Sequence, residues 1–437
     1  MSRSPGIESV AWAALAAVFL LRVAVLLFQG APGSEAWEGR ISYTDTHSYL
    51  HAAEELSDGS QAEPLFRTPG YPILLNATAD LAGPRWTCTM ILQQIAELAT
   101  ALAVAAMAAQ TLGRQLGAVS GALYMCLPSG IIYSSYMIPD VHVSMLTALS
   151  GLLWLRIHRG GTIPGAAVAG LGGGLCMAAG LMLKPVVLYS PVIYAALTAV
   201  PGPGRARRAV FAAALAVPLA ASYLLLRTHN ENSFGLPGMT TQDALEPMGR
   251  MVQIADYRGL GVGGGTFWMY RDSLEALCTV DGVMDYAMRD SVFRAAARDA
   301  VLSNPLRVAW FELSRWPKFF VNLDAHRPYL GLTPPDRKPL LYAGLTTILQ
   351  FPLLIALVSA LPSRRVRAEL GGIFWLGLAW FLYSVPVIGP IASFRYGLMF
   401  YWALVPFVPA AASVLLRRRR QREDIPVAQS TGRKVSP

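Results

Sequence analysis

The chain has 437 residues, of which 54% are hydrophobic and only 14% are charged, and its mean hydropathy is +0.42. Soluble domains carry about 25% charged residues, so this composition excludes an ordinary soluble protein and predicts a polytopic membrane protein. The net charge of +9 could suggest a nucleic-acid partner. The basic residues, however, gather in short clusters between apolar stretches, and this placement argues against nucleic-acid binding.

The apolar stretches predict an all-α fold with about ten transmembrane helices. A helix needs about 20 mainly apolar residues to cross the hydrocarbon core of a bilayer. The segments of this kind run approximately over residues 10–29, 86–110, 115–134, 137–155, 164–182, 185–201, 208–226, 339–361, 369–388 and 393–416. The first is interpreted as a retained anchor, because no convincing cleavage site follows it, and its Arg22 is expected to pair inside the bundle.

The basic clusters predict the orientation of these spans. They lie at 156–159, 205–208, 364–367 and 417–422, which fall on one side if ten spans alternate. The positive-inside rule places them, and both termini, in the cytoplasm. The Arg- and Ala-rich composition favours a bacterial source, and hence the bacterial cytoplasmic (inner) membrane.

Four parts follow from this topology. They are a transmembrane module over 1–227 with a first extracytoplasmic loop at 30–85, an extracytoplasmic segment with amphipathic helices over 228–338, C-terminal transmembrane helices over 339–416, and a basic cytoplasmic tail over 417–437.

The stretch 42–75, directly after the first span, has the highest density of ionisable side chains. A helix is predicted from Asp45 onward, because apolar residues recur there at positions i, i+3, i+4 and i+7. Its apolar face comprises Tyr49, Ala52, Ala53 and Leu56, and its polar face comprises His47, His51, Glu54 and Asp58. The sequence RTPGYP at 67–72 then breaks the helix and turns the chain back toward the membrane.

The segment 228–338 is too long to be a simple connection. Residues 229–249 and the Gly-rich 257–267 are interpreted as irregular or flexible, the latter as a mobile loop that closes over a substrate. Residues 283–302 predict an amphipathic helix. The aromatic and basic residues of 304–323 favour the membrane interface.

Several short motifs, in their order along the chain, resemble a known family. They are Asp45 with Tyr49, FRTPGYP at 66–72, LPSGIIYSSYMIPD at 127–140, GLMLKP at 180–185, the aromatic segment 304–320, and SFRYGLMFYWALVPF at 393–407. Together they resemble the polyprenyl-phosphate-dependent membrane glycosyltransferases of the C-type (GT-C) fold, in the branch of the protein mannosyltransferases and the aminoarabinose transferases. The sequence departs from the protein mannosyltransferases in lacking a Glu next to Asp45.

This resemblance implies that Asp45 and Asp140 are catalytic carboxylates. Asp45 would act as the base for an acceptor hydroxyl, and Asp140 would orient the acceptor, hold a metal with Asp45 or tune its pKa. Each residue has a structural alternative, because each also stands where an aspartate can cap a helix.

The resemblance further implies a donor-phosphate site formed by Lys184, Arg395 and Arg67. The alternative is that Lys184 and Arg395 reach lipid headgroups and that Arg67 braces the Pro-Gly turn. Three tyrosines are expected in the substrate pocket: Tyr49, Tyr71 and Tyr396.

No cofactor is certain from the sequence, and a divalent metal at Asp45 and Asp140 stays open. His47 and His51 have a spacing that can hold zinc, but without an HExxH pattern they are interpreted as polar-face residues.

The function expected is therefore transfer of a sugar from a polyprenyl-monophosphate donor to an acceptor hydroxyl on the extracytoplasmic face, with inversion and with Asp45 as the base. The acceptor would be a lipid, a glycan or a protein. The alternatives are a transporter or flippase of lipid-linked glycans, and a non-catalytic membrane scaffold. Transporters often show inverted repeats and broken mid-membrane helices, whereas the polar residues here gather at one face.

Overall fold

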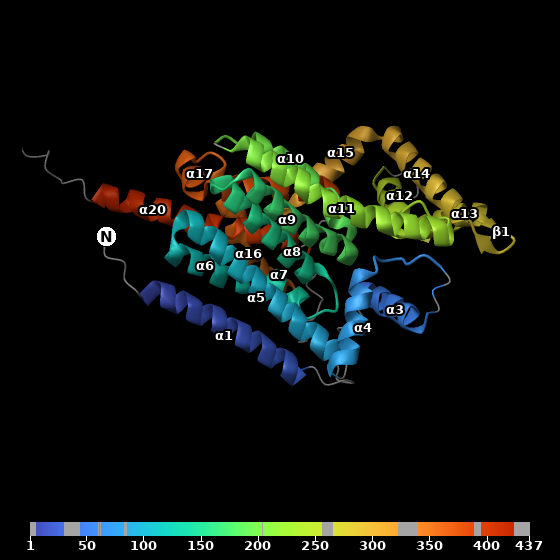
Figure 1. Cartoon of the computed structure of the whole chain (residues 1–437), viewed down its shortest axis with the longest axis horizontal. Coiled ribbons are helices and arrows are strands. Elements are labelled where there is room, and N and C mark those ends of the chain that lie inside the picture. The colour runs from blue at the N-terminus through green and yellow to red at the C-terminus, as the bar shows by residue number, and fades with distance from the viewer. Residues whose placement is uncertain are drawn as a thin grey trace, which may run out of the picture.

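The computed structural model describes residues 6–29, 44–59, 61, 63–82, 85–202, 204–255, 265–321, 339–388 and 395–423. Nearly every element is a helix, and the molecule is elongated (Figure 1). The start of α1 (Gly6–Gln29) and the end of α20 (Phe407–Glu423) lie at one end, and the hairpin of β1 (Thr279–Val280) and β2 (Val283–Met284) lies at the other.

A helical bundle forms the main body. Besides α1 and α20 it contains α5 (Arg85–Leu112), α6 (Arg114–Met125), α7 (Pro128–Tyr133), α8 (Asp140–Arg159), α9 (Ile163–Leu183), η1 (Pro185–Val187), α10 (Ser190–Ala196), η2 (Leu197–Ala199), α11 (Arg205–Phe234), α16 (Pro339–Ala360), α17 (Arg364–Leu370), α18 (Gly372–Ile388) and α19 (Leu398–Leu404). Helices α9 and α11 approach closely at Gly170 and Gly174, where an added Cβ would lie 2.5 Å from a carbonyl oxygen of α11. Small residues allow such backbone contact in membrane helix pairs.

Within the described residues, five helices are long and apolar enough to cross a membrane. They are Gly6–Leu27, Thr87–Leu112, Ile163–Leu183, Arg205–Phe234 and Leu398–Arg419, and a sixth is possible if Gly344–Ala360 and Arg364–Leu370, bent by 111°, form one span. The all-α membrane fold is therefore confirmed, but the expected count of about ten spans is not.

Prolines and charges account for much of the difference. The expected span 115–134 is divided between α6 and α7 just before Pro128, and 185–201 consists of short pieces that begin at Pro185. Helix α8 is 20 residues long but carries Asp140 at one end and two arginines at the other. Proline removes a backbone donor and breaks regular helix, a feature that a hydropathy window does not register.

The stretch after the first span folds into two helices. The predicted helix is α3 (Thr44–Asp58), whose Tyr49 and Ala53 are buried while His47 and His51 are exposed, as the periodicity indicated. Helix α4 (Gly70–Ala82) was not predicted. It begins against the end of α9, because a Cβ at Gly70 would lie 2.5 Å from the carbonyl oxygen of Met182.

A second group of helices, the distal helical group, lies beyond the end of the bundle that is farthest from α20 (Figure 1). It comprises α12 (Gln242–Ala255), α13 (Gly265–Leu277), α14 (Tyr286–Ser303) and α15 (Pro305–Ser314), which leads into η4 (Trp316–Phe319). Its own core is formed by Ala244, Met248, Val252, Phe293, Ala296, Ala297, Ala300 and Val308.

The predicted helix over 283–302 is confirmed as α14, although Val283 and Met284 belong to β2. The prediction that 229–249 is irregular is wrong at both ends, because α11 continues to Phe234 and α12 begins at Gln242. Asp243 stabilises this start by accepting hydrogen bonds from the backbone N–H groups of Met239 and Thr240. Residues 257–264 of the Gly-rich stretch, and the tail beyond 423, lie outside the described residues.

Candidate active site

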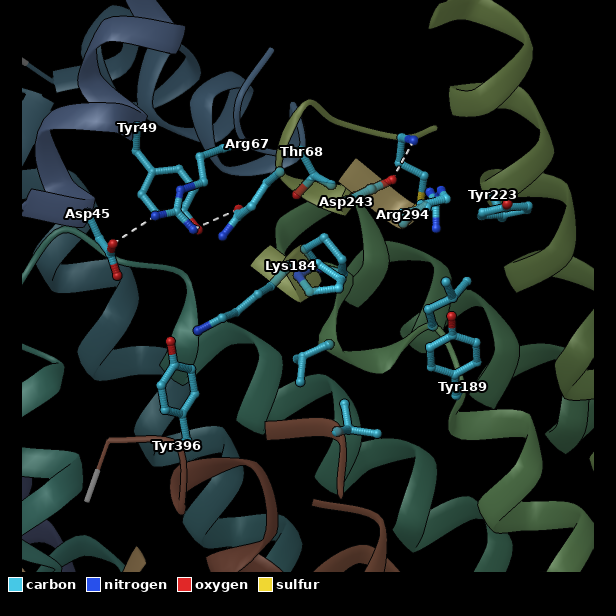
Figure 2. Close-up of a pocket in the computed structure, with 17 residues that line it drawn as sticks. Asp45, Tyr49, Arg67, Thr68, Lys184, Tyr189, Tyr223, Asp243, Arg294 and Tyr396 are labelled. Carbon is cyan, nitrogen blue, oxygen red and sulfur yellow. Dashed lines mark hydrogen bonds and ion pairs between the residues drawn. The ribbon is translucent and has the colours of Figure 1, made fainter. Parts of the chain in front are cut away.

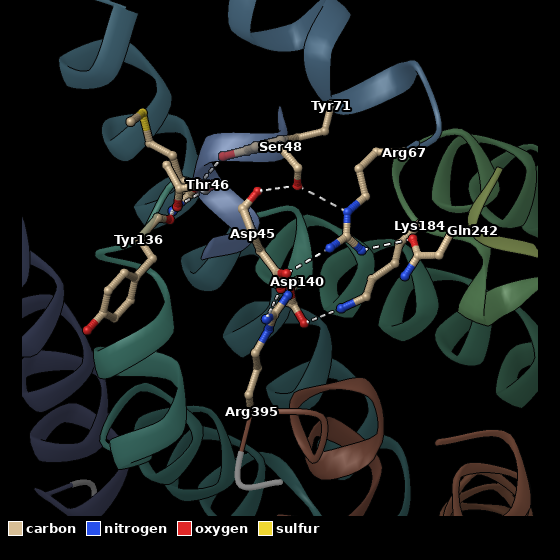
Figure 3. A network of polar contacts seen from close by, with 12 residues as sticks. Asp45, Thr46, Ser48, Arg67, Tyr71, Tyr136, Asp140, Lys184, Gln242 and Arg395 are labelled. Atoms are coloured by element: carbon tan, nitrogen blue, oxygen red, sulfur yellow. Dashed lines mark hydrogen bonds and ion pairs between the residues drawn. The ribbon is translucent and has the colours of Figure 1, made fainter. Parts of the chain in front are cut away.

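Five charged side chains from separate segments meet at the end of the bundle next to the distal helical group (Figure 3). We call them the charged cluster. They are Asp45 in the first turn of α3, Arg67 in the turn before α4, Asp140 in the first turn of α8, Lys184 between α9 and η1, and Arg395 shortly before α19.

Each carboxylate of the charged cluster is bridged by two cations. Arg67 Nη2 donates to Asp45 Oδ1 at 2.7 Å, and Arg395 donates to the other oxygen of Asp45. Arg395 Nη2 also donates to Asp140 Oδ2 at 2.8 Å, and Lys184 Nζ donates to Asp140 Oδ1 at 2.8 Å. Three cations face two carboxylates, so the cluster has a formal excess of one positive charge.

The surroundings fix the charge state of Asp45. Burial alone would raise its pKa, but the nearby guanidinium groups of Arg395 and Arg67 outweigh burial and hold the pKa below its usual value. Asp45 is therefore ionised at neutral pH. Only 22% of its side chain is exposed, so its attraction to the two arginines is weakly screened by solvent.

Lys184 experiences the opposite balance. Burial, together with the positive charge of Arg395, lowers its pKa to about 8, although the carboxylate of Asp140 acts against this shift. Lys184 is therefore mostly protonated at pH 7 but loses its charge within the mildly alkaline range.

A cavity of about 380 Å³ adjoins the charged cluster (Figure 2). Asp45, Arg67 and Lys184 line it, whereas Asp140 is fully buried behind them. The distal helical group supplies Gln242, Asp243, Pro247 and Arg294. The bundle and its connecting segments supply Pro185, Val186, Leu188, Tyr189, Tyr223 and Val387, and Thr68 and Met239 come from the segments before α4 and α12. The cavity volume is within the range of about 300–1,000 Å³ that small-molecule sites occupy.

Two of the three tyrosines expected in the pocket line this cavity. The guanidinium of Arg67 lies 5.4 Å from the ring centroid of Tyr49, and Lys184 Nζ lies 4.5 Å from that of Tyr396. Tyr71 lies behind Tyr49 instead, with its ring edge-on at a centroid distance of 5.0 Å. Its hydroxyl donates to Gln93 Oε1 at 2.7 Å.

Sequence reasoning missed several residues near the charged cluster. Arg67 donates to Ser48 Oγ at 3.2 Å and to Gln242 Oε1 at 2.9 Å. Gln242 begins a helix that was not predicted, so no pattern in the sequence could connect it with Arg67, 175 residues away. Tyr223 and Arg294 likewise reach the cavity from helices without a recognisable motif.

The charged cluster does not fit a divalent metal. Asp45 and Asp140 are each already paired with two cations, which would repel a further cation. Among the residues that the structure describes, no group of three or more His, Cys, Asp or Glu side chains is arranged to hold a metal. His51 lies 3.6 Å from Glu55, on the exposed side of α3.

Arg22 confirms the expectation of a partner inside the bundle. Its Nη1 lies 3.6 Å from Glu97 Oε2, and its guanidinium donates to the carbonyl oxygens of Met125 and Gly130 and to Ser134 Oγ. Ionisable residues within a membrane bundle are stable only when they are paired in this way.

Comparison with solved structures identifies the fold. The structure of the archaeal oligosaccharyltransferase AglB from Archaeoglobus fulgidus, in complex with an inhibitory peptide and a dolichol-phosphate, aligns with a TM-score of 0.54 at 12% sequence identity. The apo form of the Archaeoglobus fulgidus oligosaccharyltransferase aligns with a TM-score of 0.51 at 11% identity, covering 94% of this chain and 52% of that one. The first alignment covers 99% of this chain and 53% of the AglB chain, so the present chain spans about half the length of that protein.

ArnT from Cupriavidus metallidurans bound to undecaprenyl phosphate aligns less closely, with a TM-score of 0.42 at 12% identity, over 96% of this chain and 81% of that one. No protein-family model and no curated protein matches the sequence. The likeness to the oligosaccharyltransferase therefore concerns the fold, and it confirms the expected GT-C fold.

Proposed function

We propose that the chain is an integral-membrane glycosyltransferase that moves one sugar from a polyprenyl-monophosphate carrier to an acceptor hydroxyl on the extracytoplasmic face. The observation that carries this proposal is the charged cluster, where a buried excess of positive charge and an ionised carboxylate adjoin one cavity. An anionic leaving group and a base are the two requirements that such a transfer places on a site.

The phosphate of the donor would lie against Lys184 and Arg67, which both line the cavity. A lysine ammonium has three donors, and Asp140 accepts one of them in the described contacts. Lys184 can therefore bind a phosphate oxygen while it keeps its bond to Asp140. Arg395 is only 4% exposed and joins both carboxylates, so its charge would stabilise the phosphate while its hydrogen bonds order Asp45 and Asp140.

The reaction would be a single displacement at the anomeric carbon. The acceptor oxygen forms a bond to this carbon as the bond from the carbon to the phosphate oxygen breaks, and the electron pair of that bond leaves with the phosphate. The hydroxyl proton passes to Asp45. Because the pKa of Asp45 is lowered, this transfer becomes favourable only late in the displacement, when the attacking oxygen carries positive charge.

The arginines also control how basic Asp45 is. Both oxygens of Asp45 accept hydrogen bonds from arginines. A phosphate that shares the donors of Arg67 would weaken one of these contacts and make Asp45 more basic when the donor is bound. Binding of the donor and activation of the base would then be linked.

The direct test is incubation of the purified protein, in lipid nanodiscs, with a panel of polyprenyl-phosphate sugars labelled in the sugar. Release of free polyprenyl phosphate that depends on an added acceptor supports the proposal. Binding of the labelled lipids without any release, or their movement across a sealed bilayer with the sugar still attached, would contradict it and favour a scaffold or a flippase.

A further inference from the structure

The chain that leads into Asp140 is not helical, although it is buried in the bundle. Helix α7 ends at Tyr133 and α8 begins at Asp140, and residues 134–139 between them are all buried. Irregular backbone inside a membrane bundle is stable only where its N–H and C=O groups find partners in the protein. The partners of this segment therefore determine where Asp140 lies.

One side chain bonds two backbone carbonyl oxygens of this segment. Gln93 of α5 is fully buried, and its Nε2 donates to the carbonyl oxygens of Ser134 at 2.8 Å and of Tyr136 at 2.7 Å. Thr46 of α3 makes a longer bond, at 3.3 Å, to the next carbonyl oxygen, that of Met137. Gln93 thus fixes the segment four residues before Asp140.

The oxygen of the same amide begins a series of contacts that leads to Asp45. Gln93 Oε1 accepts the hydroxyl of Tyr71 at 2.7 Å, and the ring of Tyr71 packs edge-on against Tyr49 of α3. Tyr49 stands one turn after Asp45 and beneath Arg67.

We infer that Gln93 is a positioning residue of the active site, which sets the separation of Asp45 and Asp140 by joining the two segments that carry them. This inference rests on the proposed function. Gln93 does not line the cavity, so it acts through Tyr71 and the backbone of 134–136. A displacement of a reacting group by about 1 Å can cost on the order of 100-fold in rate.

The test compares two neighbouring glutamines. Gln94 is equally buried, but it makes one weaker bond, at 3.2 Å, to the carbonyl oxygen of Ser134. Gln93→Met is expected to lower kcat at least about 10-fold, while the Kd for polyprenyl phosphate changes less than about 3-fold, because Lys184 and Arg67 come from other segments. Gln94→Met is expected to change kcat less than about 3-fold. Equal losses in the two variants, or unchanged kcat in Gln93→Met, would overturn the inference.

A second variant separates positioning from simple loss of folding. Gln93→Glu has nearly the same shape, and its protonated form can still donate one bond, whereas its ionised form can donate none. Its kcat should fall with rising pH as the buried carboxyl ionises, relative to the parent profile over the same range. A pH profile parallel to that of the parent would contradict the inference. If the parent protein itself releases no polyprenyl phosphate, the proposed function fails instead, so the two failures are distinguishable.

Discussion

Replacement of Lys184 by methionine tests the anion-binding role of the charged cluster. The substitution keeps an unbranched side chain, one atom shorter, but removes its charge, so the formal excess charge of the cluster falls from one to zero. Asp140 keeps its 2.8 Å bond to Arg395, so no carboxylate loses all its partners. A hydrogen bond to a charged group contributes about 1.5–3 kcal/mol, which corresponds to a loss of about 10- to 150-fold in phosphate affinity.

The assay is the Kd for polyprenyl phosphate, measured by calorimetry in nanodiscs, with thermal unfolding followed in the same samples. Lys318→Met is the matched control, since Lys318 lies in η4 and does not line the cavity. Its Kd should stay within about 2-fold of the parent value. Equal losses in both variants would show that Lys184 contributes only general attraction to the membrane surface, and an unchanged Kd in Lys184→Met would refute the phosphate site.

Two further predictions concern the same cavity. Because the pKa of Lys184 is lowered to about 8, the affinity for polyprenyl phosphate should be full below about pH 7 and should fall as the pH rises through 8. Lys184→Arg stays charged and should remove this dependence. If the affinity of Lys184→Arg showed the same pH profile as that of the parent protein, the assignment to Lys184 would be refuted. Gln242→Ala removes one 2.9 Å hydrogen-bond partner of Arg67. The net loss of about 0.5–1.5 kcal/mol should raise the KM for the donor about 2- to 10-fold without lowering the temperature of unfolding. An unchanged KM would show that Arg67 needs no support from α12.

Much of the site could be anticipated from local features of the sequence. Asp45 and Asp140 each lie in the first turn of a helix, and Lys184 and Arg395 stand near the ends of apolar stretches. The expected topology and the family motifs grouped all four residues, and the structure joins them in a single network. Charged residues at the ends of spans are thus informative, since burial of a charge requires a partner.

Other features depended on tertiary packing that no local pattern encodes. Helix α12 contains Pro247, which argues against a helix, yet Ala244, Met248 and Val252 pack against α14 and stabilise it. Tyr71 was expected in the pocket on the strength of its motif, but its hydroxyl bonds to Gln93, on a helix whose amphipathic pattern gave no sign of the contact. The role inferred for Gln93 follows only from the three partners that surround it in space.

The measurement that tests the central claim most directly is the turnover of Asp45→Asn, with the Kd for polyprenyl phosphate determined on the same samples. Removal of this carboxylate raises the formal excess charge of the cluster from one to two, so the phosphate should bind at least as tightly as in the parent. Loss of the base should lower kcat by about 100-fold or more. A variant that turns over at the parental rate would contradict the account, and so would one that loses phosphate binding and turnover in equal measure.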